Sequence, residues 1–421
     1  MRRWLPALAF VAASVAAGLA QGQSLPQGTP EELGFSAERI ARLTQTLRQD
    51  VGEGGLPGAV VLVAREGKIA LFESLGAVDP QTKAPMSKDA IFRIYSMTKP
   101  VTSVAVMMLV EEGRIWLGDP IAKYLPEFKD VKVGVEKPGA DGKPTLELVA
   151  ARRPITVHDL MRHTSGLTYG IFGDNLVKRA YREGGLGGDF DMDNAEFVKR
   201  ISALPLMAQP GALWEYSHST DVLGRLIEVV SGKKLSEFFK ERIFDPLGMK
   251  DTSFVVDAAN HARVAEPYAN DRVIVPGVNL HDPRVAYKSE AGGAGLSGTA
   301  IDYARFLQML LDGGVFDGKR YLSPKTIEYM TADQLGAASR AGAYAPGEGY
   351  GFGLGFAVRE RQGGSSLPGG VGDYSWGGAA GTYFWVDPKE RMFVIYMMQS
   401  PKHRAHYRNL LKNMVYAAMT R

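Results

Sequence analysis

Hydrophobic residues follow two different periods along the chain. Near the N-terminus they recur at helical spacing behind Ser36, a good N-cap residue, and this predicts a helix over 37–50. The next apolar run is interrupted by one turn signal and predicts a pair of strands, 58–65 and 68–76. Further β-rich segments and then a final amphipathic helix are expected at 349–358, 381–387, 391–399 and 405–419.

The middle of the chain has a different pattern. Turn signals around a short apolar stretch in 134–154 predict a small hairpin. Helical periodicity then dominates, with helices expected at 156–163, 193–203, 218–231 and 235–243. Strands at both ends with helices between them favour an α+β fold, in which one antiparallel sheet is built from both termini and flanked by helices. We therefore expect an α/β domain from 30–95 and 290–421, and an inserted, mostly helical domain over 96–289.

The first residues have the layout of a secretory signal peptide. Arg2 and Arg3 precede an uncharged apolar run that ends in small residues, so residues 1–20 are expected to be removed near Ala20–Gln21. The alternative is a membrane anchor, but the run is short for a spanning helix and Pro6 interrupts it. We expect an exported protein, periplasmic or extracellular, without a membrane span after cleavage.

Composition narrows the possible chemistry. The 421-residue chain has a net charge of +3 and no basic run with interleaved aromatics, so nucleic-acid binding has little support. It contains no cysteine, which excludes thiol nucleophiles, disulfides and cysteine-based zinc sites. The pairs His158/His163 and His403/His406 lack useful metal-ligand spacing with carboxylates, and we expect no metal and no cofactor.

A serine and a lysine at helical spacing are the first candidates for chemistry. In "IFRIYSMTKP", Ser96 and Lys99 share one face of a predicted apolar helix. Burial would favour the neutral form of that lysine, which a base for the serine hydroxyl requires. The alternative is a plain N-cap serine beside a surface lysine. A second match, at Ser231 and Lys234, follows a helix whose C-cap is Gly232, and we interpret it as an exposed helix end.

Two further stretches favour the first interpretation. Tyr216 and His218 lie in a predicted loop just before an amphipathic helix. Downstream, the segment from Trp376 to Ala379 is expected to open a strand, where Gly377 and Gly378 would allow close approach of a ligand or of another backbone. A strand edge there could offer an N–H group to an oxyanion.

With these motifs the sequence resembles the serine β-lactamase and penicillin-binding-protein superfamily, in its class C-like branch. The stretches "LMRHTSGLTYG", "GAGLSGTAIDYARFLQMLLDGG" and "YGFGLGF" also carry the resemblance, which covers nearly all of 30–420. It implies that Ser96 is the nucleophile, that Lys99 and Tyr216 handle its proton, and that the N–H groups of Ser96 and Ala379 form an oxyanion hole. Tyr169 falls in a loop that resembles the family's cleft-lining region, so it either bounds the acyl pocket or simply packs.

The sequence departs from the lactamase pattern at two motifs. Trp376-Gly377-Gly378 stands where β-lactamases have Lys-Thr-Gly, and His218 stands where they have asparagine. A tryptophan cannot supply the cation that helps to hold a substrate carboxylate. The Trp-Gly-Gly form resembles the family VIII carboxylesterases, which implies a small ester substrate that contacts Trp376, Gly377, Gly378, His218 and Tyr169.

Other functions stay open at this point. A β-lactamase or D-alanyl-D-alanine peptidase would need the missing lysine, and an inactive binding protein would not need the Ser96, Lys99 and Tyr216 set. A Ser-His-Asp hydrolase would show Gly-x-Ser-x-Gly, but "GLSGT" ends in Thr299. Loops 134–154, 170–190 and 335–350 are expected to line the cleft and set the substrate preference.

Overall fold

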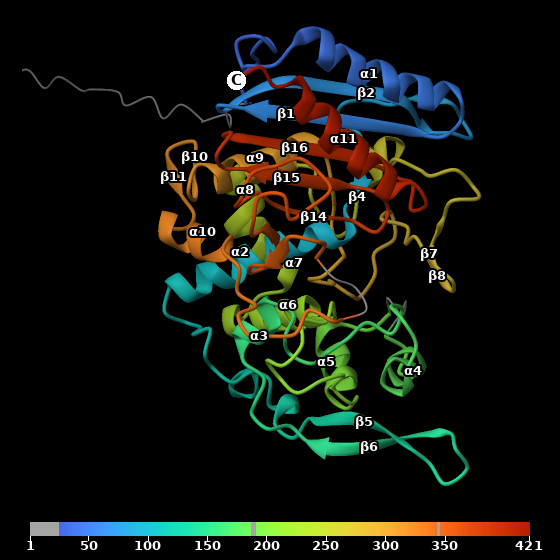
Figure 1. Cartoon of the computed structure of the whole chain (residues 1–421), viewed down its shortest axis with the longest axis vertical. Helices are drawn as coiled ribbons and strands as arrows, with labels where there is room; N and C mark the ends of the chain where they lie inside the picture. The colour runs from blue at the N-terminus through green and yellow to red at the C-terminus, as the bar shows by residue number, and fades with distance from the viewer. Residues whose placement is uncertain (1–24, 187–190, 343–345) are drawn as a thin grey trace, which may run out of the picture.

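The computed structural model describes residues 25–186, 191–342 and 346–421. The expected signal segment, 1–20, lies outside the described residues. None of the helices in the described ranges is long and apolar enough to cross a membrane. Figure 1 shows two parts, a sheet covered by helices and a helical part that ends in the β5–β6 hairpin.

An eight-stranded sheet forms the first part and joins the two ends of the chain, as the sequence predicted. The N-terminal β1 pairs antiparallel with the C-terminal β16, for example through Leu62 and Ile395. The strands, in spatial order, are β12 (Tyr350–Phe352), β13 (Ala357–Arg359), β14 (Tyr374–Gly377), β15 (Tyr383–Asp387), β16 (Met392–Met398), β1 (Gly58–Arg65), β2 (Lys68–Asp79) and β3 (Ala84–Pro85).

Both faces of this sheet are covered, which explains why β1 is apolar at almost every position. Val61 and Val63 point to the core beneath α1 (Ala37–Gly52) and α11 (Arg404–Ala418), whereas Val60 and Leu62 point to the larger core on the other face. Alternate side chains of a strand point to opposite faces, so a strand buried on both sides needs apolar residues at odd and even positions.

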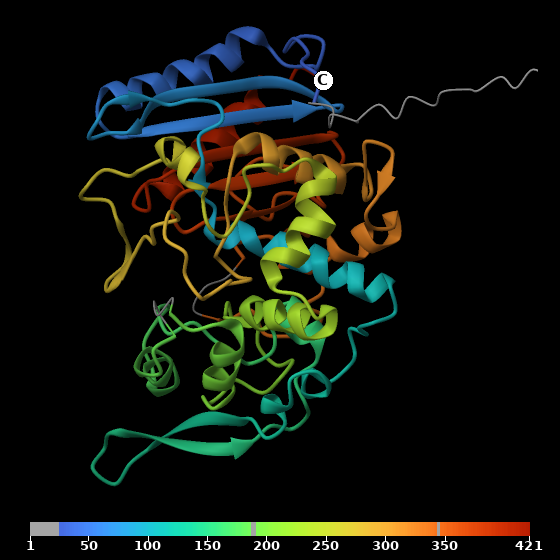
Figure 2. The ribbon, with the colours of Figure 1, turned by 180° about the vertical axis from the view of Figure 1, so that it is seen from behind.

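The helical part lies below the sheet in Figure 1, and α2 (Thr98–Glu111) runs between the two parts in the view from behind (Figure 2). Every residue of α2 from Thr98 to Leu109 is buried, in agreement with the apolar helix predicted behind Ser96. The other helices are α3 (Val157–Met161), α4 (Leu176–Glu183), α5 (Asn194–Ser202), α6 (Ser219–Ser231), α7 (Leu235–Phe239), α8 (Asp245–Leu247), α9 (Ala300–Leu311) and α10 (Pro324–Met330). The hairpin predicted within 134–154 consists of β5 (Lys132–Pro138) and β6 (Pro144–Ala150).

The structure corrects one detail of the predicted elements and adds another. Trp376 does not open a strand, because β14 ends at Gly377 and residues 378–382 form the turn into β15. The β-rich stretch 349–358 consists of two short antiparallel strands, β12 and β13, and Gly355, with a φ of 99°, allows the tight turn between them. The domain limits 30–95, 96–289 and 290–421 stay a prediction.

Candidate active site

Ser96 lies on a strained turn between a short strand and α2. The strand β4 (Phe92–Arg93) pairs with β9 (Ser297–Gly298), and the chain then enters a 3₁₀ turn over Tyr95–Met97. Tyr95 has a φ of 43°, a left-handed conformation that is unfavourable for a bulky side chain. Such a conformation persists only where its surroundings hold it, so the turn fixes the direction of Ser96.

His281 is one of the residues that fix the conformation of Tyr95. Its backbone N–H donates to the Tyr95 hydroxyl at 3.0 Å, and its Nδ1 lies 3.0 Å from the same oxygen. Burial and the Arg93 charge lower the pKa of His281 to about 4, so the ring is neutral. Burial raises the pKa of Tyr95 to about 12, against the opposing effect of the His281 backbone hydrogen bond. A neutral phenol can donate to the neutral imidazole while it accepts from the backbone, and both partners are satisfied.

Lys99 follows Ser96 by three residues on α2 and is completely buried. Its Nζ donates to Gly293 O at 2.8 Å, to Tyr169 Oη at 3.1 Å and to Ser96 Oγ at 3.4 Å. The structure therefore brings together the serine and the lysine that the sequence paired. It also explains the place of Tyr169, whose hydroxyl shares the lysine with the serine.

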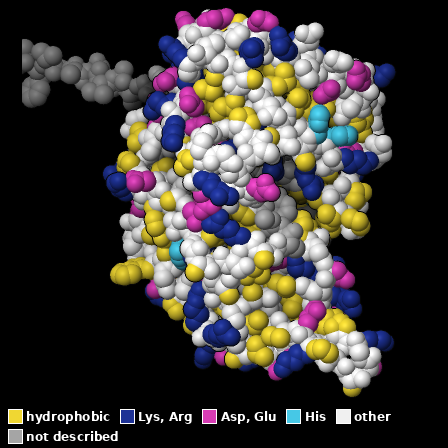
Figure 3. Space-filling model, viewed as in Figure 1, with side chains coloured by type: hydrophobic (Ala, Val, Ile, Leu, Met, Phe, Trp, Pro, Cys, Tyr) yellow, Lys and Arg dark blue, Asp and Glu magenta, His cyan; other side chains and the backbone are white. Residues whose placement is uncertain are grey.

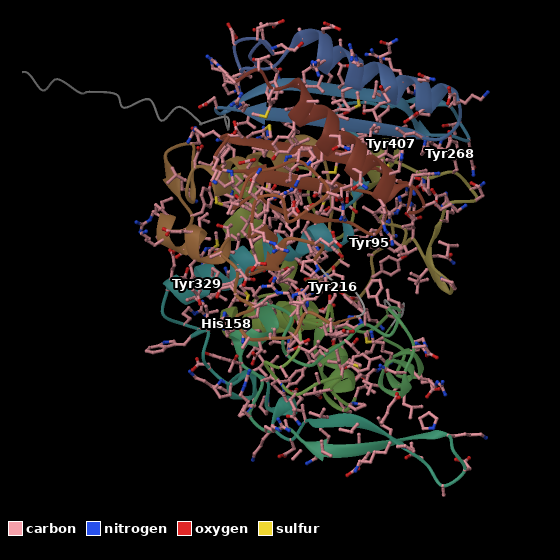
Figure 4. All side chains as sticks on the ribbon, viewed as in Figure 1. Tyr95, His158, Tyr216, Tyr268, Tyr329 and Tyr407 are labelled. Atoms are coloured by element: carbon pink, nitrogen blue, oxygen red, sulfur yellow. The ribbon has the colours of Figure 1, made fainter. Side chains whose placement is uncertain are left out.

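Tyr216 also contacts the hydroxyl oxygen of Ser96. Its hydroxyl donates to Ser96 Oγ at 2.7 Å and accepts from Trp376 Nε1 at 3.2 Å, and Lys99 Nζ lies 4.8 Å from the centre of its ring. Burial raises the pKa of Tyr216 well above its usual value, although the hydrogen bonds with Ser96 and Trp376 lower it. Figure 4 places Tyr216 and Tyr95 near each other at the junction of the two parts of the molecule.

Gly378, the second glycine after Trp376, is packed against the residue that precedes the serine turn. A side-chain carbon on Gly378 would lie 2.5 Å from Ile94 O, so no other residue fits there without a shift of the backbone. Gly377, Gly378 and Ala379 all line the same cavity as Ser96. Trp376 does not line it. The indole is buried behind Tyr216, with its ring centre 5.2 Å from the phenol and 5.3 Å from Phe352.

His218 lines the cavity and begins a chain of hydrogen bonds that ends at Lys99. Its Nδ1 lies 2.9 Å from Asp221 Oδ2, and Asp221 Oδ1 accepts from Gly293 N at 2.8 Å. The carbonyl of Gly293 is the one that holds Lys99 Nζ. Burial alone would raise the pKa of Asp221, but the hydrogen bond and charge of His218, together with Lys99 and the Gly293 N–H, keep it below its usual value.

Asp221 and Gly293 were missed by the sequence analysis. His218 is the N-cap of α6 and Asp221 is its third residue, the spacing at which an acidic side chain folds back onto a helix start. That spacing was the available signal for Asp221. Nothing local marked Gly293, because its role depends on a segment 72 residues from Asp221 in the sequence.

The cavity beside Ser96 has a volume of about 240 Å³ and is apolar over much of its surface. Of the three loops expected to line it, only 170–190 contributes described residues, and part of that stretch is the helix α4. Besides Ala379, the described apolar lining residues include Ile171, Phe172, Leu186, Met192, Phe197, Phe254, Ile274, Val275, Val278, Ala291 and Ala294.

Known proteins share this sequence and architecture. The Beta-lactamase family model matches residues 43–416. Protein Rv1367c of Mycobacterium tuberculosis is 37% identical over 369 residues, which cover 84% of this chain and 88% of that protein. Esterase EstB of Burkholderia gladioli is 32% identical over 374 residues, with the same shares of each chain.

A solved structure gives the same result. EstCE1, described as a hydrolase with promiscuous acyltransferase activity, superposes with a TM-score of 0.73 at 26% identity, covering 90% of this chain and 99% of its own. The matches extend over the sheet, the helical part and the junction that holds Ser96. The chain therefore belongs to the β-lactamase family, in the branch that resembles the family VIII esterases, and it is a serine hydrolase of that family.

Proposed function

We propose that this protein hydrolyses short-chain carboxylic esters through an acyl-enzyme on Ser96. The observation that carries the proposal is the double contact at Ser96 Oγ, which lies 2.7 Å from Tyr216 Oη and 3.4 Å from Lys99 Nζ at the wall of a small apolar cavity. A serine with two proton-handling groups in reach has what nucleophilic acyl transfer requires.

The steps follow from this geometry. Ser96 Oγ forms a bond to the ester carbonyl carbon while the Lys99/Tyr216 pair takes its proton. The N–H groups of Ser96 and Ala379 stabilise the oxyanion, the bond to the alcohol oxygen breaks, and the alcohol leaves with the proton from the pair. A water molecule then attacks the acyl-enzyme, gives a proton to the pair and releases the acid, and Ser96 regains its hydrogen.

The ester preference rests on Trp376 and on the relatives. Trp376 replaces a cationic residue of the lactamase pattern with a neutral indole that serves Tyr216, and a relative at 32% identity bears the name esterase. Figure 3 shows Lys and Arg interspersed with Asp and Glu on the visible face, without a large patch of one charge.

We also propose that the protein is exported and that residues 1–20 are removed by cleavage. Mass spectrometry of the mature N-terminus would test this.

The test compares a chromogenic short-chain ester with a chromogenic cephalosporin, using wild type, Ser96→Ala and Ser231→Ala. Ser231 is the serine of the second Ser-x-x-Lys match and ends α6, so it is the matched control. We expect fast ester turnover that is lost in Ser96→Ala and kept in Ser231→Ala, with slow or no lactam cleavage. Turnover that survives in Ser96→Ala would overturn the proposal, and fast lactam cleavage would replace the esterase with a lactamase.

A further inference from the structure

A buried ion pair lies behind one wall of the cavity. Lys178 Nζ, on α4, is 2.7 Å from Glu215 Oε1, and both side chains are only 3% exposed. We propose that this pair determines specificity by position: it holds residues 168–172, the wall segment, where they limit the length of the ester chain that the cavity accepts. The inference rests on the proposed esterase function and specifies how its preference for short chains is set.

The wall segment faces the proposed reacting groups. All of its residues after the first line the cavity that contains Ser96. Tyr169 Oη accepts a hydrogen bond from Lys99 Nζ at 3.1 Å. The ring centre of Phe172 lies 5.9 Å from that of Tyr216. A shift of the wall segment would therefore change the space beside the serine.

The ion pair fastens the wall segment at both ends. At its start, Thr168 Oγ1 donates to Glu215 Oε1 at 2.6 Å. At its end, the carbonyl of Phe172 accepts from Lys178 Nζ. Because the two charged groups also bind each other, the wall segment and the pair form one closed ring of contacts. Removal of either charged group opens this ring.

Glu215 also connects the wall segment with the proposed proton-handling pair. It directly precedes Tyr216 in the sequence, and its backbone N–H donates to His163 O at 2.9 Å. The backbone of Glu215 is thus fixed next to Tyr216, while its carboxylate is fixed next to Thr168. One side chain therefore spans the space between the wall segment and Tyr216.

The energetics of buried charges separate positioning from stability. Removing two charges from water is costly, and their mutual attraction offsets this cost only with good geometry and further hydrogen bonds. A buried ion pair is therefore a weak source of stability compared with apolar side chains of similar volume. The pair of Lys178 and Glu215 instead provides directed contacts to Thr168 and Phe172, which apolar side chains could not make.

The size of the cavity makes its wall position important. The cavity volume is about 240 Å³, and Phe172 contributes an aromatic ring to its lining. In an apolar pocket, the fit of a single methylene group changes kcat/KM by about tenfold or more. Release of the Phe172 ring from its present place would thus admit longer chains, and the ion pair is what prevents this release.

The test measures how chain length affects ester turnover. On the acyl side, 4-nitrophenyl octanoate is compared with 4-nitrophenyl butyrate, and on the alcohol side octyl acetate is compared with butyl acetate. The measured quantity is the ratio of kcat/KM for the longer ester to that for the shorter one. Lys178→Met removes the cation and keeps an unbranched side chain. Thr168→Val is milder, because it keeps the ion pair and removes only a hydroxyl group.

Each variant has a matched control. Lys412→Met removes another buried lysine, which pairs with Asp373 at 3.1 Å. Thr44→Val removes the hydroxyl of another buried threonine, which donates to Ile40 O at 3.0 Å on α1. Neither Lys412 nor Thr44 lines the cavity. The thermal midpoint is recorded for every protein, so that a loss of stability is measured separately from a change in the ratio.

We expect the ratio in one series to rise by about tenfold or more in Lys178→Met and by about threefold or more in Thr168→Val, since a wider pocket favours the longer chain. The ratios of Lys412→Met and Thr44→Val should equal that of wild type, even where the thermal midpoint falls. An unchanged ratio in Thr168→Val overturns the inference, whether or not Lys178→Met folds. An equal rise in the matched control overturns it as well.

These outcomes are distinct from failure of the proposed function. Turnover that depends on Ser96, with the same ratio in all variants, would leave the esterase proposal intact and remove only the role of the ion pair. A wild-type protein without ester turnover would overturn both.

A double-variant cycle tests whether the contact acts through the wall segment. Phe172→Ala widens the cavity directly and should raise the ratio by itself. Thr168→Val should then add less in the Phe172→Ala protein than in wild type, because the ring that it releases is already absent. Full additivity of the two changes would contradict a limit on chain length that operates through Phe172.

Discussion

At the scale of single residues, the candidate site is a set of side chains that share one serine oxygen. Lys99 and Tyr216 both contact Ser96 Oγ, and Trp376 contacts Tyr216 in turn. Trp376 was expected to touch the substrate, but its observed position makes it a support for Tyr216. The indole N–H is the part of Trp376 that this arrangement uses, since phenylalanine would fill most of the same space.

Replacing Trp376 with phenylalanine should therefore slow ester turnover. Loss of a neutral hydrogen bond of about 0.5–1.5 kcal/mol corresponds to a fall in kcat of about two- to tenfold. The measurement is steady-state kinetics on a neutral aryl ester, with the thermal midpoint recorded for each protein.

Trp214→Phe is the matched control for that variant. Trp214 is also fully buried and stacks on Tyr216, with ring centres 6.2 Å apart, but its Nε1 has no hydrogen-bond partner among the described residues. It should lose stability without the same loss of kcat. Equal losses of kcat in the two variants would mean that the indole acts through packing alone.

At the scale of elements, local signals were sufficient where the chain is periodic. The helix predicted over 37–50 is α1, capped by Ser36, and the strands predicted over 58–65 and 68–76 are β1 and β2. The residues of helix α4 were predicted to lie in a loop because the helix is short and rich in polar residues. The side of α4 that is buried depends on the cavity that it borders. Trp376 was predicted to open a strand because two glycines follow it. In the structure these glycines lie at the end of β14 and in the turn that follows it.

The start of α3 gives a prediction about stability and pH. Asp159 is buried, accepts from both terminal nitrogens of Arg153 at 2.6 and 2.9 Å, and completes a capping box with Thr156. Burial alone would raise the pKa of Asp159, but these bonds lower it to about 2. A carboxylate with a lowered pKa stabilises the fold above its unfolded pKa of about 4, and the stabilisation is lost as the pH falls toward 2.

Asp159→Asn should therefore lower the free energy of unfolding at pH 7 by about 2 kcal/mol. The difference from wild type should shrink below pH 4. Urea unfolding at several pH values measures both effects. Asp141→Asn, in the exposed turn of the β5–β6 hairpin, is the control and should stay within about 0.5 kcal/mol of wild type. A difference for Asp159→Asn that does not change with pH would contradict the electrostatic explanation.

At the scale of the whole molecule, the C-terminal end of the described chain is held beside residues 34–36, near its N-terminal end. Ser36 N donates to Ala418 O at 2.8 Å, and Thr420 N donates to Gly34 O at 2.9 Å. The sheet is continuous through the β1–β16 pairing, so its stability does not depend on where the chain is opened, provided that the opening lies in an exposed turn.

A circular permutant should therefore fold and keep its activity. Arg421 would be joined to Leu25 through about eight Gly/Ser residues, which span roughly 16 Å. New ends would lie between Asp141 and Gly142, in the exposed hairpin turn. Opening the chain between Ser103 and Val104 instead, inside the buried α2, should prevent folding. Circular dichroism and ester turnover would check both proteins, and an unfolded hairpin permutant would show that the order of the chain matters.

Much of this molecule was determined by the sequence itself. Periodicity predicted the main helices and strands, because burial of one face imposes a repeat that neighbouring residues carry. The spacing of Ser96 and Lys99 paired them without any distant information, since one helical turn brings them together. The later motifs that resemble the family then indicated the partner, Tyr216.

Only the tertiary structure decided the rest. Trp376 behind Tyr216 and Asp221 bound to Gly293 are contacts between segments far apart in the sequence. Such contacts depend on how whole elements pack, and no local period records them. The sequence by itself thus paired the proposed reacting groups, Ser96, Lys99 and Tyr216, whereas the packing of the sheet against the helical part decided which side chains surround and support them.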